Sequence, residues 1–254
     1  MPASTLATAR RALSLLDLTD LSESADAAGL AALCARATSA PGPVAAICIW
    51  PRFVAQARTM LGRAPVKIAT VVNFPQGDAT GADVLAETQA ALAAGTDEID
   101  LVLPWRAFLA GDAAGAEAMV RAVREACGDK RLKVILETGE YPDLDRVRAA
   151  SELAIAAGAD FIKTSTGKTA HSASLSAART MLEVIAASGR PIGLKPSGGI
   201  RTLADAEAYL SLADEIMGPH WATAETFRFG ASGLHQVLVD VIAGSAAGQS
   251  SGSY

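Results

Sequence analysis

The sequence predicts an α/β protein folded as a single (β/α)8 barrel. Short β-rich runs alternate with Ala-rich stretches whose apolar positions recur at three- and four-residue spacing, as in parallel strands joined by crossover helices. Eight such runs in 254 residues match the size and strand count of this barrel. A doubly wound parallel sheet also alternates, but it usually has fewer strands, and no GxGxxG follows the first run.

The predicted elements follow one another along the chain without an interdomain linker. The strands are expected at residues 15–18, 45–50, 68–73, 98–103, 133–137, 160–164, 192–196 and 226–230. Helix-like segments such as 83–94 and 114–126 lie between them, and several end at a glycine, which favours a left-handed C-cap. The stretch before residue 15 and the helix-like segment 25–37 are expected to cap the lower mouth of the barrel. We therefore assign residues 1–243 to the barrel domain and the Gly/Ser-rich residues 244–254 to a flexible tail.

Composition excludes several classes of protein. Half of the residues are hydrophobic, which excludes a disordered chain. The 22 Lys and Arg against 27 Asp and Glu give a charge of −5 with no dense basic block, so no nucleic-acid partner is expected. No apolar run approaches the roughly 18–20 residues that span a bilayer, and the first residues lack the pattern of a signal peptide, so no membrane partner is expected.

The cysteines indicate the compartment. Cys34, Cys48 and Cys127 are an odd number and have neither CxxC nor zinc spacing, as expected for reduced thiols in a cytoplasmic protein. No HxH, HExxH or paired-carboxylate spacing is present, so no metal site is expected.

Charged residues inside the predicted strands are the strongest sign of chemistry. Strand residues alternate between faces, which places Glu98 and Asp100 on one face of the fourth strand and turns Lys163 and Lys195 inward from the sixth and seventh. Lysine and aspartate are almost never buried without partners, and barrel enzymes hold their reacting groups at the carboxyl ends of the strands. Two neighbouring ammonium groups disfavour each other's charge, so one amine can be neutral and attack a carbonyl to form a Schiff base. For either lysine considered alone, the simpler interpretation is that it ends a strand and its side chain extends to solvent.

Glycine-rich loops beside these lysines indicate a phosphate site. Ser197-Gly198-Gly199 follows the seventh strand and Gly230-Ala231-Ser232-Gly233 the eighth, the usual position of the phosphate in this architecture. The segment Thr166-Gly167-Lys168 adds a cation from the sixth loop.

Other candidates leave alternatives open. Asp17, near the end of the first strand, can orient a lysine or hold a water, or it can cap a turn. Cys48 can line the pocket, although a small core residue is the simpler interpretation. Glu137, at the end of the fifth strand, is a candidate partner of Lys163, and a lone tail tyrosine such as Tyr254 is usually inert.

Several segments together resemble one family. They are LLDLTDL, AAICIWPRF, ATVVNFPQG, DEIDLVLPWRAFLAG, KVILETGE, ADFIKTSTGK, GLKPSGGIRT and FRFGASG. The sequence resembles the deoxyribose-phosphate aldolases, class I aldolases with a TIM barrel, over nearly the whole chain from Leu15 to Tyr254.

The resemblance implies a reaction and its residues. The reaction is the reversible cleavage of 2-deoxy-D-ribose 5-phosphate into acetaldehyde and D-glyceraldehyde 3-phosphate, without a cofactor. It implies that Lys163 forms the Schiff base, that Lys195 perturbs its pKa, that Asp100 is the acid/base residue acting through a water, and that Tyr254 assists proton transfer at the enamine carbon. The implied phosphate-binding residues are Gly167, Lys168, Gly198, Gly199, Gly230 and Ser232. A homodimer is expected because the family includes dimers.

Two departures from the family pattern stand out. Ser197 replaces the alanine of KPAGG, and Gly233 stands where the second serine of a pair is expected. The loss of one hydroxyl predicts a weaker hold on phosphorylated substrates.

Three other interpretations remain from the sequence. A class I aldolase for a longer ketose phosphate would use the same lysine. A non-catalytic phosphosugar-binding barrel would use the lysines only to hold anions. A scaffold protein would need an exposed apolar surface, of which the sequence gives no sign.

Overall fold

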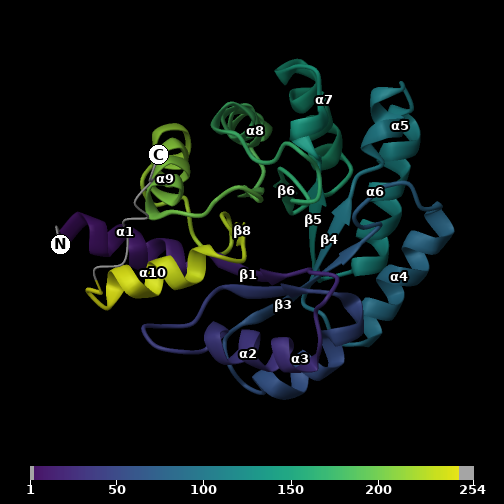
Figure 1. The fold of residues 1–254 in the computed structure, drawn as a ribbon. Coiled ribbons are helices and arrows are strands. Elements are labelled where there is room, and N and C mark those ends of the chain that lie inside the picture. The colour runs from purple at the N-terminus through teal and green to yellow at the C-terminus, as the bar shows by residue number, and fades with distance from the viewer. Residues whose placement is uncertain (1–2, 246–254) are drawn as a thin grey trace.

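Eight parallel strands form a barrel in the computed structural model, which describes residues 3–245 (Figure 1). The strands are β1 (Leu16–Asp20), β2 (Ala46–Ile49), β3 (Lys67–Val72), β4 (Glu98–Val102), β5 (Arg131–Ile135), β6 (Phe161–Lys163), β7 (Gly193–Lys195) and β8 (Phe229–Ala231). Their order is β7-β6-β5-β4-β3-β2-β1-β8. The last gap, between β7 and β8, is closed by parallel bridges from Leu194 to Phe227 and from Ser197 to Gly230. The predicted barrel is therefore confirmed, and the doubly wound sheet, which would have two open edges, is wrong.

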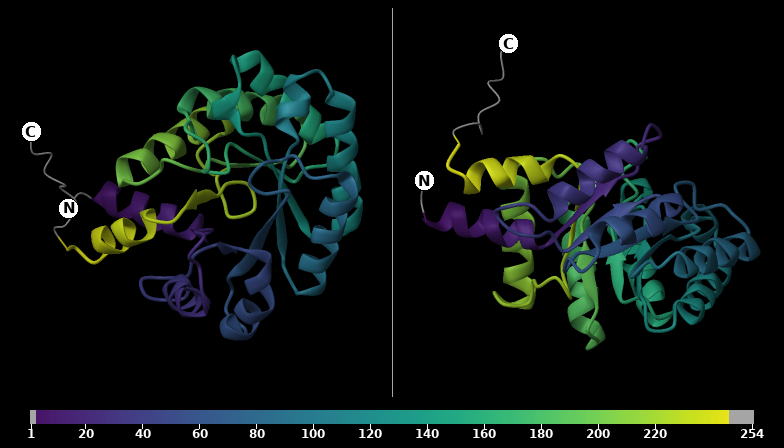
Figure 2. Two further views of the ribbon diagram at one scale, coloured as in Figure 1. Left: turned by 45° about the vertical axis from the view of Figure 1, so that its right-hand side comes forward. Right: turned by 90° about the horizontal axis from the view of Figure 1, so that it is seen from below.

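Helices surround the strands as an outer layer (Figures 1 and 2). They are α1 (Ala3–Ser14), α2 (Ala27–Ala37), α3 (Val54–Leu61), α4 (Gly81–Ala93), α5 (Trp105–Leu109), α6 (Ala113–Cys127), α7 (Leu144–Ala156), α8 (Leu175–Ser188), α9 (Leu203–Met217) and α10 (Leu234–Ile242). Two 3-10 turns, Pro51–Phe53 and Thr138–Glu140, follow β2 and β5. The helix-like segments 83–94 and 114–126 are α4 and α6. Within residues 3–245, no helix is both long and apolar enough to cross a membrane.

The two segments expected to cap the lower mouth have different positions. α1 packs against α10 and α9. α2 contacts β1, β2 and α3, which makes it the crossover helix between the first two strands. The expectation that α2 caps the lower mouth is therefore wrong, because its apolar side chains, including Leu30 and Leu33, are buried against the neighbouring elements in the outer layer.

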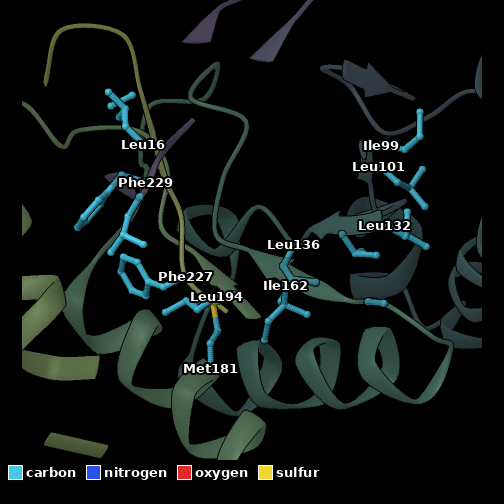
Figure 3. Packing of buried hydrophobic residues seen from close by; sticks show 14 of the residues in the cluster. Leu16, Ile99, Leu101, Leu132, Leu136, Ile162, Met181, Leu194, Phe227 and Phe229 are labelled. Atoms are coloured by element: carbon cyan, nitrogen blue, oxygen red, sulfur yellow. The ribbon is translucent and has the colours of Figure 1, made fainter. Parts of the chain in front are cut away.

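The main hydrophobic core lies between the strands and the helices. Outward-facing strand residues such as Ile99, Leu101, Ile162 and Leu194 are fully buried there, and Figure 3 shows them with Met181 of α8. A parallel sheet covered by helices needs this apolar outer face. Because adjacent strand residues point in opposite directions, the core also turns the intervening residues toward the barrel axis.

Inside the barrel, small residues make room for large ones. Gly193 lies opposite Phe161 in the register of β6 and β7, and a Cβ atom on Gly193 would lie 2.4 Å from the Phe161 ring. Phe161 is fully buried, with the guanidinium carbons of Arg131 and Arg228 5.3 and 6.0 Å from its ring centroid. A glycine at this position lets the ring fill the lower part of the barrel.

The substitution Gly193→Ala should therefore destabilise the protein. Overpacking of a filled interior typically costs about 1–3 kcal/mol of the free energy of unfolding, and the new methyl group would overlap the buried aromatic ring. Denaturant unfolding of this variant and of Gly42→Ala provides the measurement, because a Cβ atom on Gly42 meets nothing within 4 Å. Equal stability of the two variants would contradict this account of the interior.

Candidate active site

A network of buried ion pairs occupies the barrel interior and is centred on Asp100. Its Oδ2 atom accepts hydrogen bonds from Lys163 Nζ and Lys195 Nζ, each at 2.8 Å, and its Oδ1 atom accepts one from Lys133 Nζ at 2.9 Å. The strand register explains the meeting, since Lys163 pairs with Lys195 across β6 and β7 and Asp100 pairs with Lys133 across β4 and β5. The structure thus brings together the three residues to which the sequence analysis gave most weight.

Asp17 joins the network from β1. Its Oδ2 atom lies 2.6 Å from Lys195 Nζ as a close ion pair without hydrogen-bond alignment, and its Oδ1 atom accepts a hydrogen bond from Arg228 Nη1 at 2.6 Å. Asp17 therefore contacts a lysine, which is one of the two alternatives that the sequence left open. β1 and β8 pair directly, which places Arg228, the residue before β8, beside this carboxylate.

The lower half of the network was not anticipated. Lys133 Nζ donates to Glu98 Oε2 at 2.5 Å, and Arg228 Nη2 donates to Glu98 Oε1 at 3.0 Å. Glu98 was recognised only as a neighbour of Asp100 on one strand face, and the two cations were not singled out. The alternation of strand residues could have identified Lys133. It lies between the outward-facing residues Leu132 and Val134 and must point inward, just as Lys163 does after the outward-facing Ile162.

Taken together, the network includes the half-buried Arg131, which lies 3.1 Å from Glu98 Oε1, and a fully buried part with four cations against three carboxylates. They are Lys133, Lys163, Lys195 and Arg228 against Asp17, Glu98 and Asp100. None of these residues is more than 2% exposed. Buried charges of this kind are stable only when each has close partners of opposite sign.

The pairing fixes which groups stay charged. Burial by itself would raise the pKa of Asp100, but the ammonium groups of Lys133, Lys163 and Lys195 hold the pKa well below its usual value. Burial lowers the pKa of Lys195, yet the carboxylates of Asp100 and Asp17 outweigh it and raise that pKa. Lys195 therefore stays an ammonium. Lys163 has the fewest partners of the four, since among the described residues its ammonium contacts only the Asp100 oxygen that it shares with Lys195.

A cleft of about 620 Å³ opens above the network, at the carboxyl ends of the strands. It is lined by the predicted phosphate residues Gly167, Lys168, Gly198, Gly199, Gly230 and Ser232, and by Thr166. The lysines lie beneath the cleft: a Cβ atom on Gly230 would lie only 3.1 Å from Lys195 Cε. Arg201 also lines the cleft and was missed, although it stands two residues after Gly199 in the GGIR segment.

The N-terminus of α10 supplies backbone N–H groups at this cleft. Six other helices begin with a side chain that accepts a first-turn N–H, from Asp26, Thr80, Asp112, Asp143, Ser174 and Thr202. α10 begins instead at Gly233, which has no capping side chain and lines the cleft. Uncapped N–H groups at a helix N-terminus form a favourable site for an anion.

Glu137 has a different environment from the one expected. It accepts hydrogen bonds from the Thr166 amide at 3.1 Å and hydroxyl at 2.6 Å, and makes no ion pair with Lys163 among the described residues. Its backbone is left-handed, with a φ of 62°, and burial raises the pKa of its carboxyl group. Glu137 therefore holds the loop after β6 in place, and Thr166 with it.

Cys48, Tyr254 and a metal site are the remaining points of the sequence-based expectation. Cys48 is fully buried inside the barrel in an apolar cluster with Leu21, Ala69 and Val71, and burial raises the pKa of its thiol. Tyr254 lies outside the described residues. No group of His, Cys, Asp and Glu side chains that could hold a metal ion occurs in the described part of the chain.

Comparisons with known proteins agree on one family. The sequence profile described as DeoC/LacD family aldolase matches residues 11–238. A deoxyribose-phosphate aldolase of Agrobacterium fabrum is 55% identical over 221 residues, which cover 86% of this chain and 85% of that protein.

Solved structures extend the similarity to the fold. A protein from Toxoplasma gondii, provisionally described as a deoxyribose-phosphate aldolase, superposes with a TM-score of 0.87 at 28% identity over 97% of this chain and all of its own. A similarly described protein from Coccidioides immitis gives a TM-score of 0.82 at 29% identity over 94% of this chain and 87% of its own. With a matching profile over most of its length and a relative at 55% identity, the chain belongs to the DeoC/LacD family of aldolases.

Proposed function

We propose that this aldolase reversibly cleaves 2-deoxy-D-ribose 5-phosphate into acetaldehyde and D-glyceraldehyde 3-phosphate through a Schiff base on Lys163. The observation that carries the proposal is the buried amine of Lys163, which has a single carboxylate contact among the described residues. It shares that oxygen with Lys195, whose Cε lies close to Gly230 in the lining of a cleft suited to a phosphate. The name of the Agrobacterium fabrum relative supports the choice of substrate.

The reaction begins at the amine of Lys163. The nitrogen lone pair attacks C1 of the open-chain sugar, and loss of water leaves an iminium ion. Lys195 supports this step, because its ammonium lies on the same Asp100 oxygen and favours the neutral form of Lys163 over a second cation.

Cleavage then needs a proton acceptor near the C3 hydroxyl. Asp100 takes this proton through a water molecule, and the C2–C3 electron pair moves toward the iminium nitrogen. Glyceraldehyde 3-phosphate leaves, C2 of the enamine is protonated, and hydrolysis of the new iminium ion releases acetaldehyde and free Lys163. Tyr254 is the proposed proton donor at C2, and Asp17 holds the Lys195 ammonium in place throughout.

The phosphate occupies the cleft in this proposal. The N–H groups at the start of α10 and the glycines of the β6, β7 and β8 loops face it, and Lys168 and Arg201 supply positive charge. Lys168 Nζ donates to the carbonyl of Leu21 at 2.8 Å, which keeps its ammonium at the rim. Thr166 lines the remainder of the site, and Cys48 is buried close to the lysines.

The cellular setting belongs to the proposal as well. The partner is a small sugar phosphate that the enzyme degrades in the cytoplasm, without a metal ion. The expected homodimer stays a prediction, as does the assignment of residues 1–243 to the catalytic domain.

Covalent trapping tests the function. Incubation with acetaldehyde and sodium borohydride should add one reduced ethyl group per chain, mapped by peptide mass spectrometry to Lys163. Dihydroxyacetone phosphate, the donor of an aldolase for longer sugars, should give no adduct. Binding of the sugar phosphate without any adduct on a folded protein would favour the non-catalytic barrel.

Substitutions of Lys163 and Lys195 should have different effects in this trapping assay. Lys163→Ala should abolish trapping because it removes the nucleophile. Lys195→Leu should retain slow trapping with its midpoint at higher pH, because the cation that disfavours the ammonium form of Lys163 is gone. Adduct formation in Lys163→Ala would show that another lysine is the nucleophile.

The missing serine hydroxyl predicts substrate preference. A Cβ atom on Gly233 meets nothing within 4 Å, so Gly233→Ser adds a hydroxyl at the α10 N-terminus without a clash. We expect kcat/KM for the phosphorylated sugar to rise about fivefold, as one added charge-assisted hydrogen bond can provide. The value for 2-deoxyribose should stay constant, and an unchanged ratio of the two would contradict the prediction.

A further inference from the structure

Arg228 is the largest fully buried side chain in the described structure and does not reach the cleft. Its Nη1 atom donates to Asp17 Oδ1 at 2.6 Å, its Nη2 atom to Glu98 Oε1 at 3.0 Å, and its Nε atom to the Ala224 carbonyl at 2.5 Å. The guanidinium is therefore held by acceptors on β1, on β4 and in the turn at Ala224, and these three hydrogen bonds restrict its rotation.

Each carboxylate held by Arg228 holds a lysine with its other oxygen. Asp17 Oδ2 lies 2.6 Å from Lys195 Nζ, and Glu98 Oε2 accepts from Lys133 Nζ at 2.5 Å. Both lysines then meet on Asp100, which also binds Lys163. A series of four ion pairs therefore links Arg228 to the amine of Lys163, through Asp17, Lys195 and Asp100.

We infer that Arg228 and Glu98 are positioning residues of opposite sign that set the pH range in which Lys163 is reactive. This inference rests on the proposed role of Lys163 as the Schiff-base lysine. The positive charge of Arg228 disfavours another cation in the same dry interior, whereas the negative charge of Glu98 favours one. In a medium of low dielectric constant, such effects persist over several ångströms.

Other charged or titratable groups surround Lys163. Asp100 from β4, Glu137 after β5 and Cys48 from β2 lie close enough to interact electrostatically with its amine. Lys195 from β7 shares an Asp100 oxygen with it, while Lys133 from β5 contacts Asp100 and Asp17 from β1 contacts Lys195. These groups determine the pH at which wild-type Lys163 becomes reactive. A substitution at Arg228 or Glu98 removes one charge and keeps all of these groups. The direction in which the reactive pH range moves therefore depends only on the sign of the charge that is removed.

The test is the pH dependence of reductive trapping with acetaldehyde and cyanoborohydride. Arg228→Gln removes a cation and should move the midpoint of the trapping rate to higher pH. Glu98→Gln removes an anion and should move it to lower pH, each by on the order of one pH unit. Arg228→Lys keeps the charge and should restore a midpoint near that of the wild type.

Arg11→Gln is the matched control. Arg11 also makes a two-pronged ion pair, to Asp214 at 2.6 and 2.7 Å, but between α1 and α9 on the outside of the barrel. It should lower stability and leave the midpoint unchanged. A purely structural role of Arg228 would give the same result as this control.

Opposite shifts in Arg228→Gln and Glu98→Gln support the inference, and shifts in one direction or none overturn it. If Arg228→Gln does not fold, Glu98→Gln alone decides, since a midpoint that stays or rises overturns the inference. An absence of trapping in the wild type would instead reject the proposed function, so the two failures are distinguishable.

Discussion

Burial of four cations inside a closed barrel is the constraint on which the rest of the structure depends. Each buried ion loses several kcal/mol of solvation that only close opposite charges can offset. The three carboxylates that do so come from β1 and β4, and Asp100 alone contacts three lysines. The barrel must therefore close between β7 and β8, because an open sheet would separate Lys195 on β7 from Asp17 on β1 and expose both.

The two faces of each strand have different environments, which allows a charged interior within a stable fold. Outward residues such as Ile99, Leu101 and Ile162 build the apolar layer against the helices, while their neighbours Glu98, Asp100 and Lys163 face the axis. Burial of the apolar outer face contributes favourable free energy of folding, and this offsets the cost of removing the interior charges from water. Function and stability thus lie on opposite sides of the same strands.

The same alternation explains how much the sequence could predict. The barrel, the inward lysines and the glycine loops follow from periodicity and from position at strand ends, so they were predicted. The partners of those lysines depend on register between strands distant in sequence, such as Glu98 with Arg228. Local patterns carry no such information, which is why Arg228 was missed and the hydrogen bonds from Thr166 to Glu137 were not predicted.

The cleft and the network also constrain each other. A phosphate group brings negative charge close to the lysines, and negative charge stabilises the ammonium form of a nearby amine. An amine that must act as a nucleophile is therefore at a disadvantage once the substrate binds. Lys168 and Arg201 line the same cleft, so in the proposed binding mode their positive charges would offset the charge of the phosphate. With that charge balanced locally, the cations beneath the cleft can keep disfavouring a further positive charge while the substrate is bound.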